Sequence, residues 1–288
     1  MTALGPEASG RLEGTARRLT ALSIGAYSNP HVRFDWPDKP SPDRFAMSES
    51  LLAMGGHPLL RKMDDGQRWR LALLEATNFF SLNIAGEREL MEGLASRLYG
   101  SLPVFVSRYL QHFLHEENAH TSVFARFCLD YGGQIFREPQ VRLPRRYLPG
   151  EEDFLFFARV LIFENVAHYY NRQLAGDESL WGLARDINRY HAEDEVRHIA
   201  FGRELVGDMW QRFAGRWSEE DRDRIRGYLA AYVQTVLRSY VNADVYRTLG
   251  LPETTRGEIL ETAHWQDLAA KSTRGVTACL RAIGVVEQ

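Results

Sequence analysis

Residues 190–198 read Tyr190-His191-Ala192-Glu193-Asp194-Glu195-Val196-Arg197-His198, and this stretch decides the predicted fold. On an α-helix, at about 100° per residue, His191 and His198 lie about 20° apart and Glu195 lies within about 60° of both. Three metal-binding side chains therefore share one narrow face of a predicted helix. The other charged residues should lie outside that face: Glu193 and Arg197 toward solvent, and Asp194 at its edge beside the ligands.

A matching Glu-x-x-His pattern lies earlier in the chain, at Glu117 and His120. One match means little, because roughly one is expected by chance in a chain with this many Glu and His residues. The first two matches are each preceded, about 30 residues earlier, by a glutamate amid apolar neighbours: Glu87 before Glu117, and Glu164 before Glu195. A third match, Glu261 to His264, has no glutamate at residues 221–252 to serve as its partner, and is interpreted as chance.

The doubled pattern predicts a metal site inside a helical bundle. One Glu from each of two helices and one Glu-x-x-His from each of two others is the ligand set of di-iron and di-manganese carboxylate bundles. Four carboxylates would neutralise two divalent ions, whereas without metal they would repel one another and take up protons. Oxygen and imidazole ligands favour iron, or manganese, over a structural zinc site. The predicted ligands are Glu87, Glu117, His120, Glu164, His191, Glu195 and His198.

Some alternatives stay open at this stage. Buried Glu and His could instead pair with one another or with the backbone, and His191 could be a hydrogen-bond donor to Glu195 rather than a ligand. Glu89 and Glu75 are the alternatives to Glu87, but Glu89 faces glycines and Glu75 lies too far upstream. His168, one turn after Glu164, is expected to line the site rather than to bind metal.

Composition narrows the function classes. A net charge of −3 over 288 residues argues against nucleic acid and anionic membranes as partners. Cys128 and Cys279 are too few for a disulfide framework or a thiolate site. The first residues show no secretory signal, and the best apolar run, 154–163, is short and contains Arg159. A soluble cytoplasmic protein is expected.

Apolar periodicity predicts an all-α protein, with no useful strand alternation. We expect one domain, 1–288, in which a ferritin-like four-helix bundle at about 66–213 binds the metals and further N- and C-terminal helices surround it. The expected helices span 7–26, 47–54, 65–99, about 101–131, 151–174, 178–213 and 219–243, with one or two more at 254–283; 28–48 is expected to be a loop.

The metal pattern resembles a known family. Glu117-x-x-His120, Glu164 and His191-x-x-x-Glu195-x-x-His198 are similar to the motifs of the arylamine N-oxygenases, typified by the p-aminobenzoate N-oxygenase. The histidine four residues before the last Glu-x-x-His distinguishes this family from most ferritin-like di-iron proteins. The resemblance covers about 66–210. It implies that Glu87, Glu117 and His120 bind mainly one iron and that the other four ligands bind mainly the second, with some carboxylates bridging the two.

The same resemblance implies a reaction. Two iron ions would activate O2 as co-substrate, and a primary, aromatic amine would be oxidised through hydroxylamine and nitroso to nitro compounds in natural-product biosynthesis. No Gly-rich dinucleotide motif follows a strand, so electrons would come from a separate reductase or other external donor. A homodimer is expected. The rival interpretations are a di-iron C–H hydroxylase and a ferroxidase or other iron-handling protein.

The resemblance leaves the substrate-binding residues unplaced. Lys271 and Arg274, on a late predicted helix, are candidates for contact with an anionic substrate group, but a solvated helix surface is the favoured interpretation of each.

Overall fold

The computed structural model describes residues 10–100, 102–137 and 146–286. Within these ranges every regular element is helical, which confirms the predicted all-α class. None of the described helices is both long and apolar enough to cross a bilayer.

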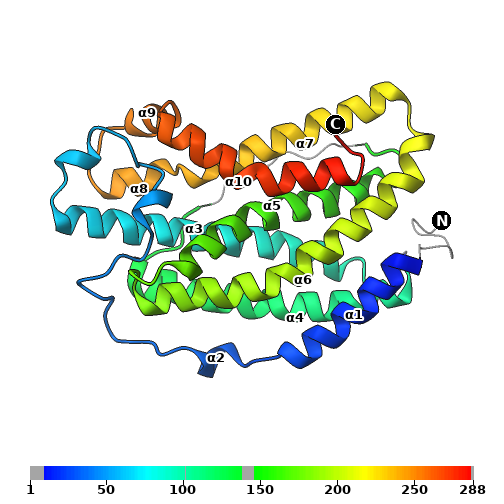
Figure 1. Ribbon diagram of the computed structural model, residues 1–288, viewed down its shortest axis with the longest axis horizontal. Helices are drawn as coiled ribbons and strands as arrows, with labels where there is room; N and C mark the ends of the chain where they lie inside the picture. The colour runs from blue at the N-terminus through cyan, green and yellow to red at the C-terminus, as the bar shows by residue number, and fades with distance from the viewer. Residues whose placement is uncertain (1–9, 101, 138–145, 287–288) are drawn as a thin grey trace.

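Four long helices form the centre of the molecule (Figure 1). They are α3 (Asp65–Ala95), α4 (Val104–Phe127), α5 (Glu151–Gly176) and α6 (Gly182–Phe213). Only a few residues separate α3 from α4 and α5 from α6, so the chain forms two antiparallel pairs. A π-helical turn, Cys128–Gly132, extends α4 until Gly133 ends it with φ = 73°.

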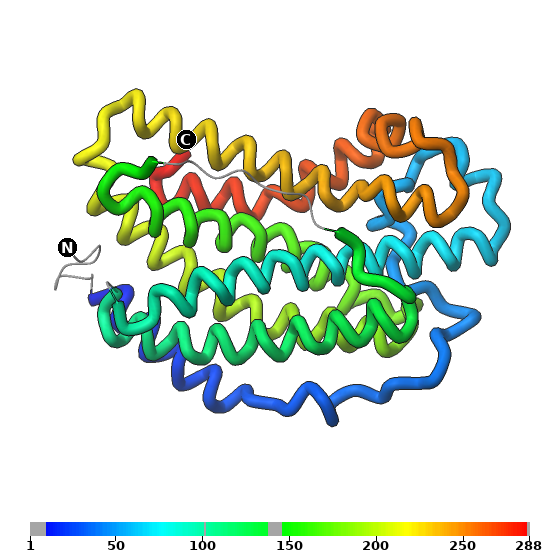
Figure 2. Tube along the Cα trace, turned by 180° about the vertical axis from the view of Figure 1, so that it is seen from behind, coloured from blue at the N-terminus to red at the C-terminus, as the bar shows by residue number. Residues whose placement is uncertain are grey.

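Further helices cover the bundle on two opposite sides, as the front and back views show (Figures 1 and 2). On one side α1 (Gly10–Ala26) packs against α4 and α6. On the other, α7 (Glu219–Tyr240) packs against α3 and α5, and α10 (Ala263–Ala282) packs against α5. The short helices are α2 (Pro30–Arg33), α8 (Ala243–Thr248) and α9 (Thr255–Leu260).

Two predicted segments differ from the structure. The helix expected at 47–54 is only a 3-10 turn, Glu49–Leu51, because the Glu75 carboxylate accepts the backbone N–H groups of Ala53 and Met54 that a helix would use. The loop expected at 28–48 contains α2, which Asn29 caps by accepting the N–H of His31.

The two core helices α3 and α5 approach each other closely at glycines. An added Cβ at Gly86 would lie 2.5 Å from the Phe163 ring, and one at Gly93 would lie 2.0 Å from the Phe156 ring. Each ring therefore occupies the place that a larger side chain on α3 would need. Phe163 directly precedes Glu164, so this contact also positions a predicted ligand.

Candidate metal centre

The seven predicted ligands come from all four core helices and meet at their centre. Glu87 is on α3, Glu117 and His120 are on α4, and Glu164 is on α5; α6 supplies His191, Glu195 and His198. Each of the seven is at most 1% exposed. Four carboxylates and three imidazoles thus share one interior space of the bundle.

Ligand-type atoms in this space lie close together. Three sets, each with atoms within 4.8 Å of one another, overlap: Glu87, His120 and His191; Glu117, His120 and Glu195; Glu164, His191 and Glu195. His198 joins them, since its Nδ1 lies 2.8 Å from Glu117 Oε1 and 3.2 Å from Glu195 Oε1. These contacts cross the division into two ligand groups that the family resemblance implies. The binding of metal by each residue stays a prediction.

Several atoms of this cluster form no well-aligned hydrogen bond, although some of them lie within ion-pair distance of one another. They are both carboxylate oxygens of Glu87 and of Glu164, Oε1 of Glu117, Oε2 of Glu195 and Nε2 of His191. A buried polar atom without a partner costs about 1–3 kcal/mol, so proteins rarely tolerate several together. Because these atoms are all lone-pair donors and converge, the residues fit a pair of bound cations.

The pKa values of the cluster carboxyls also indicate that the site fits cations. Burial, together with the neighbouring Glu117, raises the pKa of Glu87 to about 8. Burial and the charge of Glu195 raise the pKa of Glu164 well above its ordinary value. Burial therefore favours the protonated form of both carboxyls unless cations compensate their charge. Burial alone would also raise the pKa of Glu195, but His198 and His191 hold it well below its usual range.

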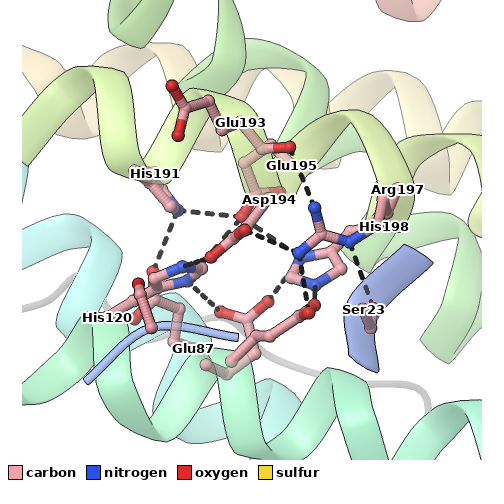
Figure 3. A network of polar contacts seen from close by, with 12 residues as sticks. Ser23, Glu87, His120, His191, Glu193, Asp194, Glu195, Arg197 and His198 are labelled. Atoms are coloured by element: carbon pink, nitrogen blue, oxygen red, sulfur yellow. Dashed lines mark hydrogen bonds and ion pairs between the residues drawn. The ribbon is translucent and has the colours of Figure 1, made fainter. Parts of the chain in front are cut away.

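A second layer of polar groups holds two of the imidazoles from behind. His120 Nε2 lies 3.0 Å from Asp194 Oδ2, and His198 Nε2 lies 2.7 Å from Glu116 Oε2. Arg197 Nη2 donates to both carboxylates at 2.6 Å (Figure 3). These bonds turn Nδ1 of His120 and of His198 toward the carboxylate cluster, as carboxylate–histidine–metal units require.

The structure corrects one prediction here. Arg197 does not face solvent: it is 8% exposed, and its Nε donates to Ser23 Oγ on α1 at 3.1 Å. The periodicity of α6 gives no sign that α1 covers this face. Glu193 does point away from the cluster (Figure 3) and pairs with Arg33 at 3.1 Å. Asp194 lies beside the ligands, as expected.

Glu116 was missed, although the sequence carries a signal for it. An acidic residue directly precedes the glutamate of both Glu-x-x-His motifs, Glu116 before Glu117 and Asp194 before Glu195. The two acids occupy equivalent places behind His198 and His120.

The remaining candidates lie outside the cluster. Glu89 is half-exposed and forms an ion pair with Arg159. Glu75 is buried, but its carboxylate accepts backbone N–H groups instead. His264 Nε2 lies 2.9 Å from the carbonyl oxygen of Leu52. Lys271 pairs with Asp267 at 2.6 Å, and Arg274 is exposed, so both fit a solvated helix surface.

His168 is partly exposed, as a residue that lines the site could be. Its Nδ1 is buried and has no hydrogen-bond partner.

A cavity of 310 Å³ lies on the histidine side of the site, between α1, α4 and α6. Glu116 and Asp194 form part of its wall, together with Tyr27, His115 and Tyr190. The acids behind the imidazoles thus border a cavity beneath α1.

Comparison with known proteins adds the family and the fold. A family model described as P-aminobenzoate N-oxygenase AurF matches residues 11–284. A solved point variant of an R2-like ligand-binding oxidase, with an aerobically reconstituted Mn/Fe cofactor, is 14% identical with a TM-score of 0.52, covering 98% of this chain and 96% of that one. The same type of oxidase without metal cofactor is 16% identical with a TM-score of 0.49, covering 98% of both chains. The first of these likenesses shows the fold, which is ferritin-like. A search of curated proteins finds no match.

Proposed function

Because the chain belongs to the P-aminobenzoate N-oxygenase AurF family, whose model matches residues 11–284, we propose that it is an O2-dependent N-oxygenase of a primary, aromatic amine. Family and fold together assign it to the di-metal oxygenases. The observation that carries the finer proposal is the third imidazole. His191 Nε2 lies 3.3 Å from Glu87 Oε1 and 2.9 Å from Glu195 Oε1, inside the cluster rather than beside it.

Two iron ions, or manganese in their place, would be held by Glu87, Glu117, His120, Glu164, His191, Glu195 and His198. Such a metal pair supplies the electrons and the Lewis acidity that activate O2. The chain contributes burial, which keeps bulk water from the reacting atoms, and the fixed orientation of its imidazoles. It must also bring the nitrogen of the amine to the metal pair with its lone pair free.

The first oxidation balances as R–NH2 + O2 + 2 electrons + 2 protons giving R–NHOH + H2O. An N–O bond forms, the O–O bond breaks, and the second oxygen leaves as water. The described residues form helices, with no strand to carry a dinucleotide-binding turn, so the electrons would come from a separate reductase or small donor. Further rounds would give nitroso and nitro products, in natural-product biosynthesis by our hypothesis.

The direct test is product analysis under 18O2. Iron-loaded protein with a chemical reductant is offered 4-aminobenzoate, aniline and the amine-free arenes benzoate and toluene. We expect one 18O on the nitrogen of the hydroxylamine product, and no product from the amine-free arenes. Oxygen on ring or side-chain carbon would instead support a C–H hydroxylase, and oxidation of Fe2+ with no organic product would support a ferroxidase.

Metal analysis tests the ligand set separately from the reaction. Purified protein should hold about two iron or manganese ions per chain. His198→Ala and Glu117→Ala should each lose most of the metal, because each removes a ligand from the centre of the cluster. Glu193→Ala, on the outer face of α6, is the matched control and should keep both ions. Full retention by the first two variants would refute the ligand assignment.

We also propose a homodimer, which sedimentation can test. Apolar side chains are exposed on and after α1, with Ile24 62% and Tyr27 64% exposed, as in a surface that a second copy covers. A dimer mass is expected. A large hollow assembly would instead support the iron-storage interpretation.

A further inference from the structure

On the side away from the cluster, the three imidazoles contact different kinds of hydrogen-bonding group. His120 and His198 each contact a carboxylate through Nε2. His191 is turned the other way: its Nε2 faces the cluster, and its Nδ1 lies 2.6 Å from the side-chain amide of Asn171. Asn171 is fully buried, and its Oδ1 has no hydrogen-bond partner.

The position of Asn171 follows from the geometry of α5. It lies seven residues after Glu164, and seven residues on a helix return to within about 20° of the same direction. One face of α5 therefore supplies both a cluster carboxylate and the amide. The neighbouring α6, which packs along α5, supplies the imidazole between them.

Proton counting decides how the amide must be oriented. A neutral imidazole carries one N–H, and a nitrogen that binds metal must offer its lone pair. If His191 Nε2 binds metal, its proton is on Nδ1, which must then donate a hydrogen bond. The amide NH2 group cannot accept it, but Oδ1 can. A 180° rotation about the last bond of Asn171 exchanges these two groups with almost no change of shape.

We propose that Asn171 is the positioning residue for His191, its Oδ1 accepting the Nδ1–H and so fixing the tautomer that presents Nε2 to the metal. The same rotation gives the orphaned Oδ1 a partner and moves the amide NH2 to the place that Oδ1 now occupies. Because the acceptor is a neutral amide, it polarises His191 less than Asp194 and Glu116 polarise the other two imidazoles. His191 is therefore the most weakly held imidazole of the three. This inference rests on the proposed metal site but not on the oxidation of an amine.

The competing arrangement has the opposite hydrogen bond. The amide NH2 of Asn171 would donate to a lone pair on Nδ1, and His191 Nε2–H would point at Glu87 and Glu195 as a structural donor. The two arrangements differ in the response to an aspartate at 171, since a carboxylate can accept a hydrogen bond but cannot donate one.

The experiment titrates the metal-free full-length protein with Co2+, whose visible absorption reports its ligands. Asn171→Leu removes the acceptor at similar volume, and Asn171→Asp keeps it. Asn78→Leu is the control, because it removes a similarly buried amide that lies outside the cluster and bonds the carbonyls of Ser239 and Tyr240 and the side chain of Asn242.

We expect Asn171→Leu to weaken the binding of one of the two Co2+ ions by about 10- to 100-fold and to change the absorption band of that ion. Asn171→Asp and Asn78→Leu should retain both ions. Equal weakening by Asn171→Asp and Asn171→Leu, or no effect of either, would overturn the inference.

Nitrogen-15 NMR of the Zn2+-loaded protein gives a second readout that does not depend on how the variants fold. His191 should carry its proton on Nδ1, and a proton on Nε2 would overturn the inference. If the wild-type protein binds no metal, both the metal site and this inference are refuted. If it binds two ions, one of them through His191, but oxidises no amine, only the proposed function is refuted.

Discussion

Arg197 balances the charges behind the imidazoles. Its guanidinium bonds two carboxylates that are themselves nearly buried, Glu116 and Asp194. Burial would raise the pKa of Asp194, yet His120 and Arg197 lower it to about 2. The ionised form of Asp194 is therefore favoured at neutral pH, in which it can accept a hydrogen bond from His120.

Replacement of Arg197 should be costly because it leaves buried charge uncompensated. For Arg197→Met we expect a loss of about 3–5 kcal/mol in the free energy of unfolding, as for other broken buried ion pairs. Arg189→Met is the control, since Arg189 pairs with Asp186 at the surface and should change stability by no more than about 0.5 kcal/mol. Urea unfolding of both variants measures this, and equal stability of the two would contradict the assigned role.

The buried Glu75 carboxyl predicts how the free energy of unfolding changes with pH. Burial raises its pKa from 4.5 to about 7, against the hydrogen bonds from Ala53, Met54 and Tyr246. Between these two pH values the folded protein holds a proton that the unfolded chain has lost, so stability falls as pH rises from about 4.5 to 7. The loss attributable to Glu75 is about 3 kcal/mol. Glu75→Gln should remove it, so the difference in unfolding free energy between variant and wild type should grow toward pH 7. A constant difference would contradict the assignment.

The sequence was sufficient to predict the residues of the cluster but, apart from Asp194, not their supporting groups. Glu87 and Glu164 could be selected because ligands of a bundle repeat with matched spacing. Asn171 could not, because a buried asparagine has no characteristic spacing and its role depends on which residue of α6 it faces. The prediction that Arg197 faces solvent was wrong for a related reason. Its partners include residues on α4 and α1, and helical periodicity describes only one helix at a time.

At the scale of helices, the four core elements were predicted with most ends within a few residues, and the errors have tertiary causes. The helix predicted from 178 begins at Gly182, after the Trp181 N–H bonds the Phe45 carbonyl at 2.9 Å. The helix predicted at 219–243 ends at Tyr240, and Asn242 caps a separate short helix. Long apolar periodicity therefore predicts a helix well, whereas its ends depend on contacts with distant residues.

The contact between α3 and α5 offers a matched pair of variants. Gly86→Ala would push on Phe163, which adjoins Glu164, whereas Gly93→Ala would push on Phe156, about two helical turns away. Overpacking of this kind costs about 1–3 kcal/mol. We expect both variants to lose stability, but only Gly86→Ala to weaken metal binding as well, which calorimetric unfolding and metal titration can separate. Equal metal affinity in both would show that the helix contact does not position the ligand.

At the scale of the whole molecule, α1 on one side and α7 and α10 on the other enclose the bundle (Figures 1 and 2). Sequence periodicity predicted the outer helices but not which faces they cover. Their placement has a chemical consequence, because α1 closes the histidine side over Arg197 and forms, with α4 and α6, the cavity that Glu116 and Asp194 border.

Metal binding should stabilise the whole fold, because the cluster is buried and is formed only when all four helices meet. A ligand that binds only the folded state adds about 2.7 kcal/mol at 100 times its dissociation constant. Metal-loaded wild type should therefore unfold at a higher temperature than the metal-free protein. Glu164→Gln separates the contributions: since burial and the charge of Glu195 favour the protonated Glu164 carboxyl when no metal is bound, the neutral amide should leave the stability of the metal-free protein nearly unchanged. The same variant should lose most of the gain on loading, because an amide oxygen is a poor substitute for a carboxylate that neutralises a cation. Scanning calorimetry with and without Fe2+ under argon measures both. If Glu164→Gln gained as much stability from metal as the wild type, Glu164 could not be a ligand, and the charge balance of the site would need a different carboxylate.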